Sequence, residues 1–246
     1  MKKLIIALLF ALPGLSMAAA PAVPLEKANI DLRDQASLQR GAKLFVNYCM
    51  GCHSVQYQRY NRMGRDIGLT DEQVREHLIF ADGKQVGDTM TIAMPRADAT
   101  RWFGTPPPDL SVITRSNGVD WIYTYLKTFY VDESRPFGFN NAVFPDVGMP
   151  HAMWQLEGLK KAITETTVAA DGSESTKVVG YEMVKPGKMN PAEFDQAARD
   201  LTNFLAYTGE PIRVERERLG VWVLIFLGIF FVFAYLLKKE YWRDVH

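Results

Sequence analysis

One segment of the chain restricts the possible folds more than any other. Residues 219–237 read LGVWVLIFLGIFFVFAYLL and contain no charged side chain. As a helix with about 1.5 Å rise per residue the segment would reach roughly 28 Å, close to the thickness of the hydrocarbon layer of a membrane. Charged residues border it, with ERER at 215–218 and KKE at 238–240. A buried core helix is the alternative, but such a helix seldom lacks any polar face. We therefore expect a transmembrane anchor within residues 213–246.

The other end of the chain also points to a membrane. Residues 1–20, MKKLIIALLFALPGLSMAAA, place two lysines before an apolar run at 4–15 and small residues after it. This order is typical of a secretory signal peptide cleaved after Ala18 or Ala20, and the run is too short to favour an N-terminal anchor. The sequence thus predicts a single-pass inner-membrane protein with an exported domain and a short cytoplasmic tail ending at His246.

The remaining residues, 21–212, are enough for one sizeable core. The whole chain has 28 basic and 28 acidic side chains, so its charge gives no reason to expect nucleic acid as a partner. We expect one periplasmic domain and a membrane as the first partner.

Both cysteines of the chain lie in the stretch YCMGCHS, as Cys49 and Cys52, and His53 follows directly. In an oxidising compartment such a pair can be a structural disulfide, a redox-active dithiol, half of a metal site, or the attachment point of a haem c. Zinc needs about four ligands, and the other histidines fall at no finger spacing. These are His77, His151 and His246.

The residues before the motif favour the haem interpretation. Residues 37–48, SLQRGAKLFVNY, carry apolar side chains at helical spacing, with Ser37 as a possible N-cap. A thioredoxin-like dithiol would need a strand there instead. Two thiols can bond the two vinyl groups of a porphyrin, and the adjacent imidazole of His53 can then bind the iron. We predict one covalent haem c.

The iron needs a sixth ligand, or else an open position that would permit peroxidase-like chemistry. Met94 and Met149 both precede proline, which keeps them out of helical geometry. Met149 is preferred because residues 136–150, PFGFNNAVFPDVGMP, predict an irregular loop that can cover one face of a ring. Met94, His77 and His151 stay open as alternatives.

A proline-rich segment can complete the site. Residues 102–115, WFGTPPPDLSVITR, contain prolines, Pro108 among them, whose carbonyls can accept the proton of His53 Nδ1. Arg115 can pair with a haem propionate. A solvated surface loop is the alternative for this segment.

Two further elements are predicted downstream. Residues 190–207 predict a helix, with Asn190 as N-cap, Pro191 at the first position and Glu193 completing a capping box. Residues 162–183 place AADGSES between β-prone runs and predict a hairpin insertion.

Several of these segments together resemble the cytochrome c1 family. They are GAKLFVNYCMGCHS, YQRYNR, PPDLSVITR, FPDVGMPHAMW, FLAYTGEP and the C-terminal anchor, in the same order from about residue 30 to 243. The resemblance implies a mainly α, class I cytochrome c-like haem domain. With the elements predicted above, the expected fold also has a small β-hairpin insertion and one C-terminal transmembrane helix. The resemblance also implies thioether links at Cys49 and Cys52, axial ligation by His53 and Met149, and a propionate near Arg115.

The function implied by the resemblance is one-electron transfer. The chain would pass electrons from the Rieske iron-sulfur protein to a periplasmic cytochrome c, beside cytochrome b, in the quinol-oxidising complex, without bond chemistry of its own. The extra disulfide of some family members is impossible here, because no third cysteine is present. An acidic docking surface is not evident, since the pairs at 71–72 and 132–133 are ordinary solvated carboxylates.

Three other functions stay open. The chain can be an anchored cytochrome c that serves a terminal oxidase or another reductase. It can be a haem enzyme with an open iron position. It can also be a membrane protein without haem, in which Cys49 and Cys52 form a structural disulfide.

Overall fold

The computed structural model describes residues 23–168 and 174–244. The predicted signal peptide and the tip of the predicted hairpin lie outside the described residues. The chain is mainly helical, with 49% of it in helices, and carries small two-stranded sheets. Its helices are α2 (Gln35–Leu44), the π-helix η1 (Phe45–Cys49), α3 (Tyr60–Asp66), α4 (Asp71–Leu78), α5 (Arg96–Phe103), α6 (Ile113–Asn117), α7 (Val119–Lys127), α8 (Trp154–Glu157), α9 (Pro191–Gly209) and α10 (Arg213–Tyr241).

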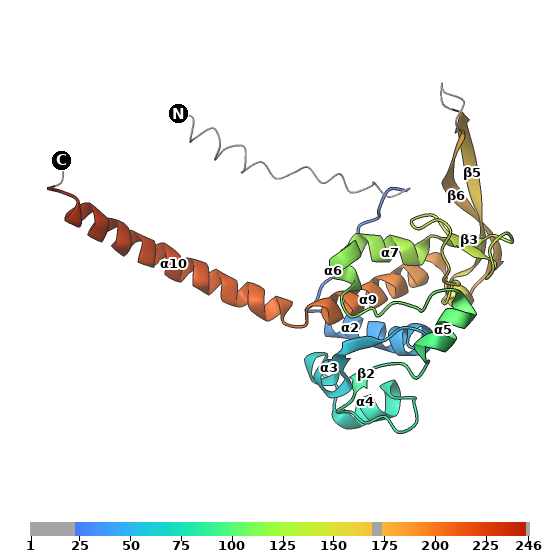
Figure 1. Cartoon of the computed structure of the whole chain (residues 1–246), viewed down its shortest axis with the longest axis horizontal. Coiled ribbons are helices and arrows are strands. Elements are labelled where there is room, and N and C mark those ends of the chain that lie inside the picture. Colours follow the sequence, from blue (N-terminus) through green and yellow to red (C-terminus); the bar gives the residue numbers. More distant parts are fainter. Residues whose placement is uncertain (1–22, 169–173, 245–246) are drawn as a thin grey trace.

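Helix α9 is the centre of the domain and packs against α2, α6 and α7 (Figure 1). Its crossing with α2 is close, because a Cβ on Gly41 would lie 2.1 Å from the carbonyl oxygen of Asp200. Only glycine permits this approach of two backbones. Phe45 and Phe204 contact each other beside the crossing, with ring centroids 5.5 Å apart. The two helices thereby hold the start of the predicted attachment motif against the core.

The predicted helix from Asn190 is confirmed. The Asn190 side chain accepts from the N–H groups of Ala192 and Glu193, and the Glu193 carboxylate accepts from the N–H of Asn190 at 2.8 Å. This reciprocal pairing satisfies backbone donors that have no partner within the helix. The buried face contains the apolar residues Phe194, Ala197, Ala198, Leu201, Phe204 and Leu205.

The predicted N-cap of the first helix was wrong. Helix α2 begins at Gln35, and the carboxylate of Asp34 accepts from the N–H of Ser37. The Ser37 hydroxyl instead donates to Asp200 Oδ1 of α9 at 2.7 Å. Ser37 is buried and its hydroxyl is used by the Asp200 carboxylate of α9, so the exposed Asp34 serves as the N-cap instead.

The strands form three antiparallel pairs within the described chain. They are β1 (Val55–Arg59) with β2 (Thr89–Met90), β3 (Phe129–Val131) with β4 (Phe139–Asn141), and β5 (Gly158–Val168) with β6 (Glu174–Pro186). The last pair confirms the predicted hairpin but is longer than expected, and it projects from the domain (Figure 1). Strand β4 lies inside residues 136–150, which were predicted to be irregular; pairing with β3 supplies the order there.

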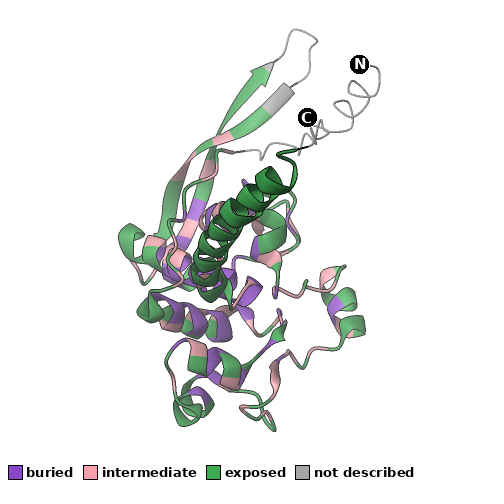
Figure 2. Ribbon diagram, turned by 90° about the vertical axis from the view of Figure 1, so that its left-hand side faces the viewer, coloured by how far each residue is buried: buried purple, intermediate pink, exposed green. Residues whose placement is uncertain are grey.

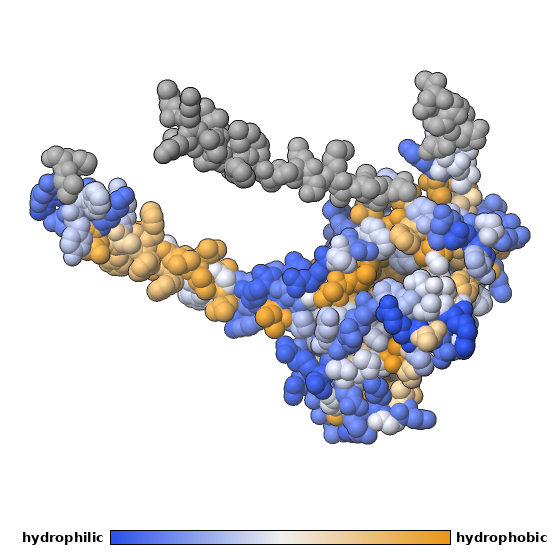
Figure 3. Space-filling view, in the orientation of Figure 1, coloured by the Kyte–Doolittle hydropathy of each residue, from blue (hydrophilic) through white to orange (hydrophobic). Residues whose placement is uncertain are grey.

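Helix α10 extends away from the domain and is long and apolar enough to cross a membrane. None of its residues is buried, and hydrophobic residues cover its middle part (Figure 3). Ion pairs between arginines and glutamates occupy its first turns, as in Arg213 with Glu217 and Arg218 with Glu215.

Candidate functional site

The Cys-x-x-Cys-His segment forms a tight turn at the end of the first helical unit. The N–H of Met50 donates to Phe45 O at 2.9 Å, which closes the π-helix. The N–H groups of Cys52 and His53 then both donate to Cys49 O, at 3.0 and 2.9 Å. The two cysteines are free thiols in the structure, with Cys49 buried and Cys52 half-buried. One turn thus carries both sulfurs and the imidazole.

The two thiols are in an environment that keeps them protonated. Burial, with a smaller effect from Cys52, raises the pKa of Cys49 to about 12, and burial also raises the pKa of Cys52. Redox-active and metal-binding cysteines usually have a lowered pKa, since the thiolate is the reactive form. Within the described ranges, no group of three or more His, Cys, Asp or Glu side chains could hold a metal ion.

His53 is buried and held in one orientation. Its Nδ1 lies 2.7 Å from the carbonyl oxygen of Pro108. A carbonyl only accepts, so Nδ1 carries the proton and Nε2 keeps a lone pair. Burial lowers the pKa of His53, against the effect of its hydrogen bond to Pro108. The neutral imidazole therefore presents Nε2 as a ligand atom.

Pro108 is positioned by a clamp between two chain segments. The Asp109 carboxylate accepts from the N–H of Gln56 at 3.0 Å and from the N–H of Ser111 at 2.9 Å. The N–H of Leu110 donates to Ser54 O at 2.8 Å. We call residues 49–58 and 108–111 together the His53 side.

Met149 lies in the loop after β4 and is half-buried. Its Sδ accepts a hydrogen bond from Tyr125 Oη of α7 at 3.4 Å. Burial raises the pKa of Tyr125, so its hydroxyl remains a donor. We call the loop 139–151 together with Tyr125 the Met149 side.

Asn141 ties this loop to the end of α7. It is fully buried, and its amide nitrogen donates to Tyr125 O at 2.8 Å. Its Oδ1 accepts from the N–H groups of Val143 and Phe144 and from the Thr128 hydroxyl. Asn140 similarly accepts from the N–H of Asp146. The loop thus has a fixed path although it contains little regular structure.

The other candidate residues lie elsewhere or are already engaged. Met94 is half-buried between β2 and α5. His77 is exposed on α4, with Nε2 3.9 Å from Glu76. His151 is buried and stacked on the ring of Phe129. Arg115 is exposed on α6 beside Gly209, at the junction of α9 and α10. Its pairing with a propionate stays a prediction.

The sequence interpretation missed two residues of the Met149 side. Tyr125 belongs to an aromatic helix face that is typical of a core, with Trp121 stacked on it at a centroid distance of 5.0 Å. Asn141 had a weak signal, since asparagine pairs in loops often bond the nearby backbone.

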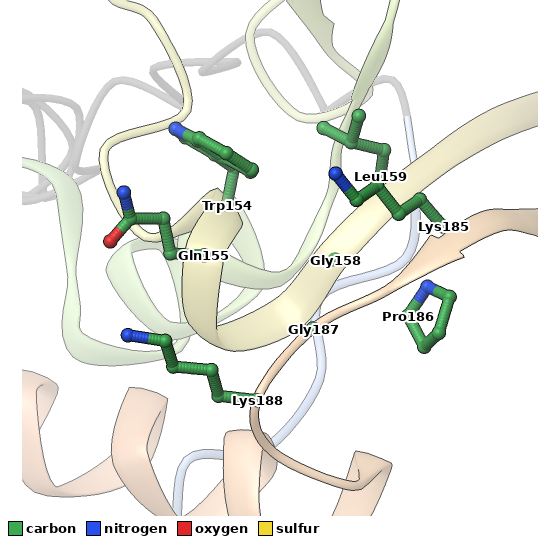
Figure 4. A pocket seen from close by; sticks show the side chains of 8 residues that line it. All are labelled: Trp154, Gln155, Gly158, Leu159, Lys185, Pro186, Gly187 and Lys188. Carbon is green, nitrogen blue, oxygen red and sulfur yellow. The ribbon is translucent and has the colours of Figure 1, made fainter.

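Two hollows of the described surface have walls that contain no residue of either side. One, of about 340 Å³, is at the base of the β5–β6 hairpin, between Trp154 and Lys188 (Figure 4). The other, of about 640 Å³, lies where α2 and η1 meet α9, and Tyr48 is part of its wall. Neither is lined by His53 or Met149.

The donor set fits a haem. The turn supplies two free thiols and an imidazole with an available Nε2, and the Met149 side supplies a thioether. Across the described residues no hydrogen bond joins the His53 side to Met149. Two thiols, one imidazole and one thioether are a set of groups that can hold a covalent, six-coordinate haem c.

Comparisons with known proteins find a family and relatives that match over most of the chain. The model of the Cytochrome C1 family matches residues 27–245. The cytochrome c1 of Allochromatium vinosum is 53% identical over 247 residues, which cover 100% of each chain. The ammonia monooxygenase gamma subunit of Nitrosomonas europaea is 44% identical over 100% of this chain and 98% of its own. The mitochondrial cytochrome c1 haem protein of Saccharomyces cerevisiae is 28% identical over 86% of this chain and 68% of its own.

Proposed function

Because this chain belongs to the cytochrome c1 family, we propose that it is the haem-bearing electron-transfer subunit of a cytochrome bc1 complex. The observation that carries the proposal is the Cys49–His53 turn, in which the Pro108 carbonyl fixes the imidazole with Nε2 available. A relative that is 53% identical over its full length bears the name of the family.

We propose that Cys49 and Cys52 bind one haem c through thioether bonds and that His53 and Met149 are its axial ligands. Bound there, a haem supplies a one-electron carrier that alternates between ferrous and ferric iron. Pro108 fixes the tautomer of His53 and strengthens it as a donor. Tyr125 holds the thioether of Met149, and the Arg115 guanidinium is proposed to neutralise a propionate. We further propose a class I cytochrome c arrangement for the domain.

The remaining task of the chain is to place the carrier between two redox partners. We propose that electrons arrive from a Rieske iron-sulfur protein and leave to a periplasmic cytochrome c, with cytochrome b as the neighbour in the membrane. The protein side chains make and break no covalent bond of a substrate in this scheme. They set the reduction potential and exclude water from the ligands.

We propose that residues 1–20 are a cleaved signal peptide and that residues 21–212 lie in the periplasm of a bacterial inner membrane. Helix α10 then crosses the membrane once, leaving the C-terminus in the cytoplasm. The exposed apolar side chains of α10 support this, since their burial in lipid is favourable (Figure 3).

A second function has one observation in its favour. A relative that is 44% identical carries the name of an ammonia monooxygenase subunit. An anchored cytochrome c that relays electrons to a different membrane enzyme, such as a terminal oxidase or another reductase, would use the same residues.

The test is a reduced-minus-oxidised visible spectrum of the tagged chain purified with its native partners in mild detergent. We expect a c-type band together with stoichiometric b-type bands, which identifies the quinol-oxidising complex. A c-type band without b-type bands would favour the relay function. A preparation without any c-type band would refute the haem site itself.

A further inference from the structure

The β5–β6 hairpin carries a buried charge into the domain at its base. Lys160, the third residue of β5, has only 8% of its side chain exposed. Its Nζ donates to Lys127 O at 2.5 Å and to Glu157 Oε1, and it lies 4.5 Å from the ring centre of Tyr181. A buried ammonium is costly unless it is paired, so Lys160 and Glu157 stabilise each other.

The same glutamate faces the segment that bears Met149. Glu157 Oε2 lies 2.8 Å from His151 Nε2, and both side chains are more than nine-tenths buried. The two atoms are not aligned for a full hydrogen bond, and neither has another hydrogen-bond partner in the described chain. His151 follows Met149 by two residues, with Pro150 between them. The charge pair therefore adjoins the segment that bears the predicted axial ligand.

A column of aromatic side chains connects His151 back to Met149. The imidazole of His151 stacks on Phe129, with centroids 5.0 Å apart and planes 5° from parallel. Phe129 in turn contacts Tyr125 edge-on at 5.0 Å, and Tyr125 donates to Met149 Sδ. The segment Met149-Pro150-His151 is thus held at both ends by the same column.

The base of the hairpin is packed closely against the domain, so it can hold Lys160 and Glu157 in place. A Cβ on Gly187 would lie 2.2 Å from Leu156 O and 2.5 Å from Gly158 N, so the two hairpin ends meet backbone to backbone (Figure 4). Gly158 also has φ +104°, which side chains rarely adopt. Burial is concentrated at this base, and the strands beyond it are mostly exposed (Figure 2).

We propose that Glu157 and Lys160 are positioning residues for Met149, acting through His151, and that the hairpin insertion supports the Met149 side of the site. This inference rests on the proposed function, because it takes Met149 to be the second axial ligand. The proposal assigns a role to the hairpin insertion, which contains none of the predicted haem ligands.

The test uses the full-length haem-loaded chain with Glu157→Gln or Lys160→Met. Each variant leaves one buried charged partner without its counter-charge. The cost of that unpaired charge is enough to shift the equilibrium between bound and released Met149 at least about tenfold. We expect the thioether-to-iron charge-transfer band of the oxidised protein to weaken. We also expect the fraction of reduced protein that binds carbon monoxide to rise at least about tenfold.

Lys161→Met is the matched control, since Lys161 is exposed on the same strand. It should keep the parent band and the parent affinity for carbon monoxide. A double-mutant cycle compares the variant that carries both Glu157→Gln and Lys160→Met with the two single variants. The double variant should release Met149 less than the sum of the two single effects predicts. If Lys160→Met does not fold, Glu157→Gln, which keeps its shape, carries the test.

Met149→Leu separates the two proposals. Loss of the band in Met149→Leu, with parent behaviour in both single variants of the pair, would overturn the positioning role and leave the ligand in place. Retention of the band in Met149→Leu would refute the ligand assignment itself. Equal changes in the Lys161→Met control would also overturn the positioning role.

Discussion

The His53 side and the Met149 side hold their ligand residues by different means. His53 lies next to both cysteines, and its proton is accepted by a backbone carbonyl 2.7 Å away. Met149 has no neighbouring attachment point; its support comes from Tyr125 and Asn141, on α7 and β4. His53 is thus kept beside both cysteines by its place in the chain, whereas Met149 is placed only by contacts with other elements.

This difference indicates which side should yield first. The turn at 49–53 closes through its own backbone hydrogen bonds and keeps His53 next to both cysteines. The Met149 side instead requires α7, β3, β4 and α8 to be in place together. Loop regions held by few contacts open at lower free energy than the core. We therefore expect perturbations of the Met149 side to alter the ligand state and those of the His53 side to alter mainly stability.

The largest effect is expected from Asn141→Ala. The change leaves the N–H groups of Val143 and Phe144 and the carbonyl of Tyr125 without their buried partner. Unsatisfied buried groups cost about 1–3 kcal/mol each, and we expect a total of about 3 kcal/mol or more. Denaturant unfolding of the full chain in detergent, followed by near-ultraviolet circular dichroism, measures the cost. Carbon monoxide binding by the reduced protein should rise as well.

The control for this prediction is Asn47→Ala. Asn47 is exposed and makes one hydrogen bond, to Lys43 O at 2.7 Å. Its loss should change stability by no more than about 0.5 kcal/mol. Equal stabilities of the two variants would contradict the role of Asn141 as the clamp of the loop.

A smaller effect is expected from Asp109→Ala on the His53 side. The change removes the acceptor for the N–H groups of Gln56 and Ser111, at a cost of about 1–2 kcal/mol. Carbon monoxide binding should stay at the parent level, because His53 remains next to its attachment points. Asp98→Ala, at an exposed pair with Arg101, is the control. A rise in carbon monoxide binding in Asp109→Ala would contradict the expectation that changes on the His53 side leave the ligand state unaltered.

The same distinction explains what could be predicted from the sequence. The turn at 49–53, the capped helix from Asn190 and the hairpin depend on residues close together in the chain, and a pattern within one window reveals them. Ser37 was misplaced because its actual partner, Asp200, is far away in sequence. Tyr125 could not be singled out, since its role depends on the path of a loop that follows it by two dozen residues.

Lys160 is the clearest case of information that the sequence does not contain. Lysines in strands are ordinarily solvated, and nothing near residue 160 indicates otherwise. Its burial follows from where the hairpin leaves the domain, beside Glu157 and the C-terminal carbonyl of α7. Only the assembled tertiary structure shows this position.

A shift in potential is expected from Tyr125→Phe. The Tyr125 hydroxyl draws electron density from Met149 Sδ, which makes the thioether a weaker donor and favours the ferrous state. Loss of one such hydrogen bond should lower the reduction potential by about 20–40 mV, since 59 mV corresponds to a tenfold change for one electron. Redox titration measures the shift. Tyr57→Phe, at an exposed tyrosine, should leave the potential unchanged, and an equal shift there would contradict the assignment.

The smallest effect concerns the helix pair that supports Tyr125. Asp195 of α9 accepts from Tyr123 and Lys127 of α7 and from Arg199. Burial raises the pKa of Asp195, but these hydrogen bonds lower it more, so it lies well below its usual range. A carboxyl with a lowered folded-state pKa stabilises the fold above its unfolded value of about 3.9. This stabilisation is lost as the pH falls from there toward the folded-state pKa.

Asp195→Asn should therefore flatten the decline of the melting temperature between about pH 5 and pH 3. The difference should be modest, because 31% of the Asp195 side chain is exposed and solvent screens the interaction. Melting curves at a series of pH values measure it, and the control is Asp98→Asn, at a carboxylate that pairs with Arg101 alone among the described residues. If the parent and Asp195→Asn decline in parallel, the contact between α7 and α9 does not depend on this carboxylate. Tyr125 would then be supported by apolar packing alone. Acid would in that case destabilise the Met149 side no more than the His53 side.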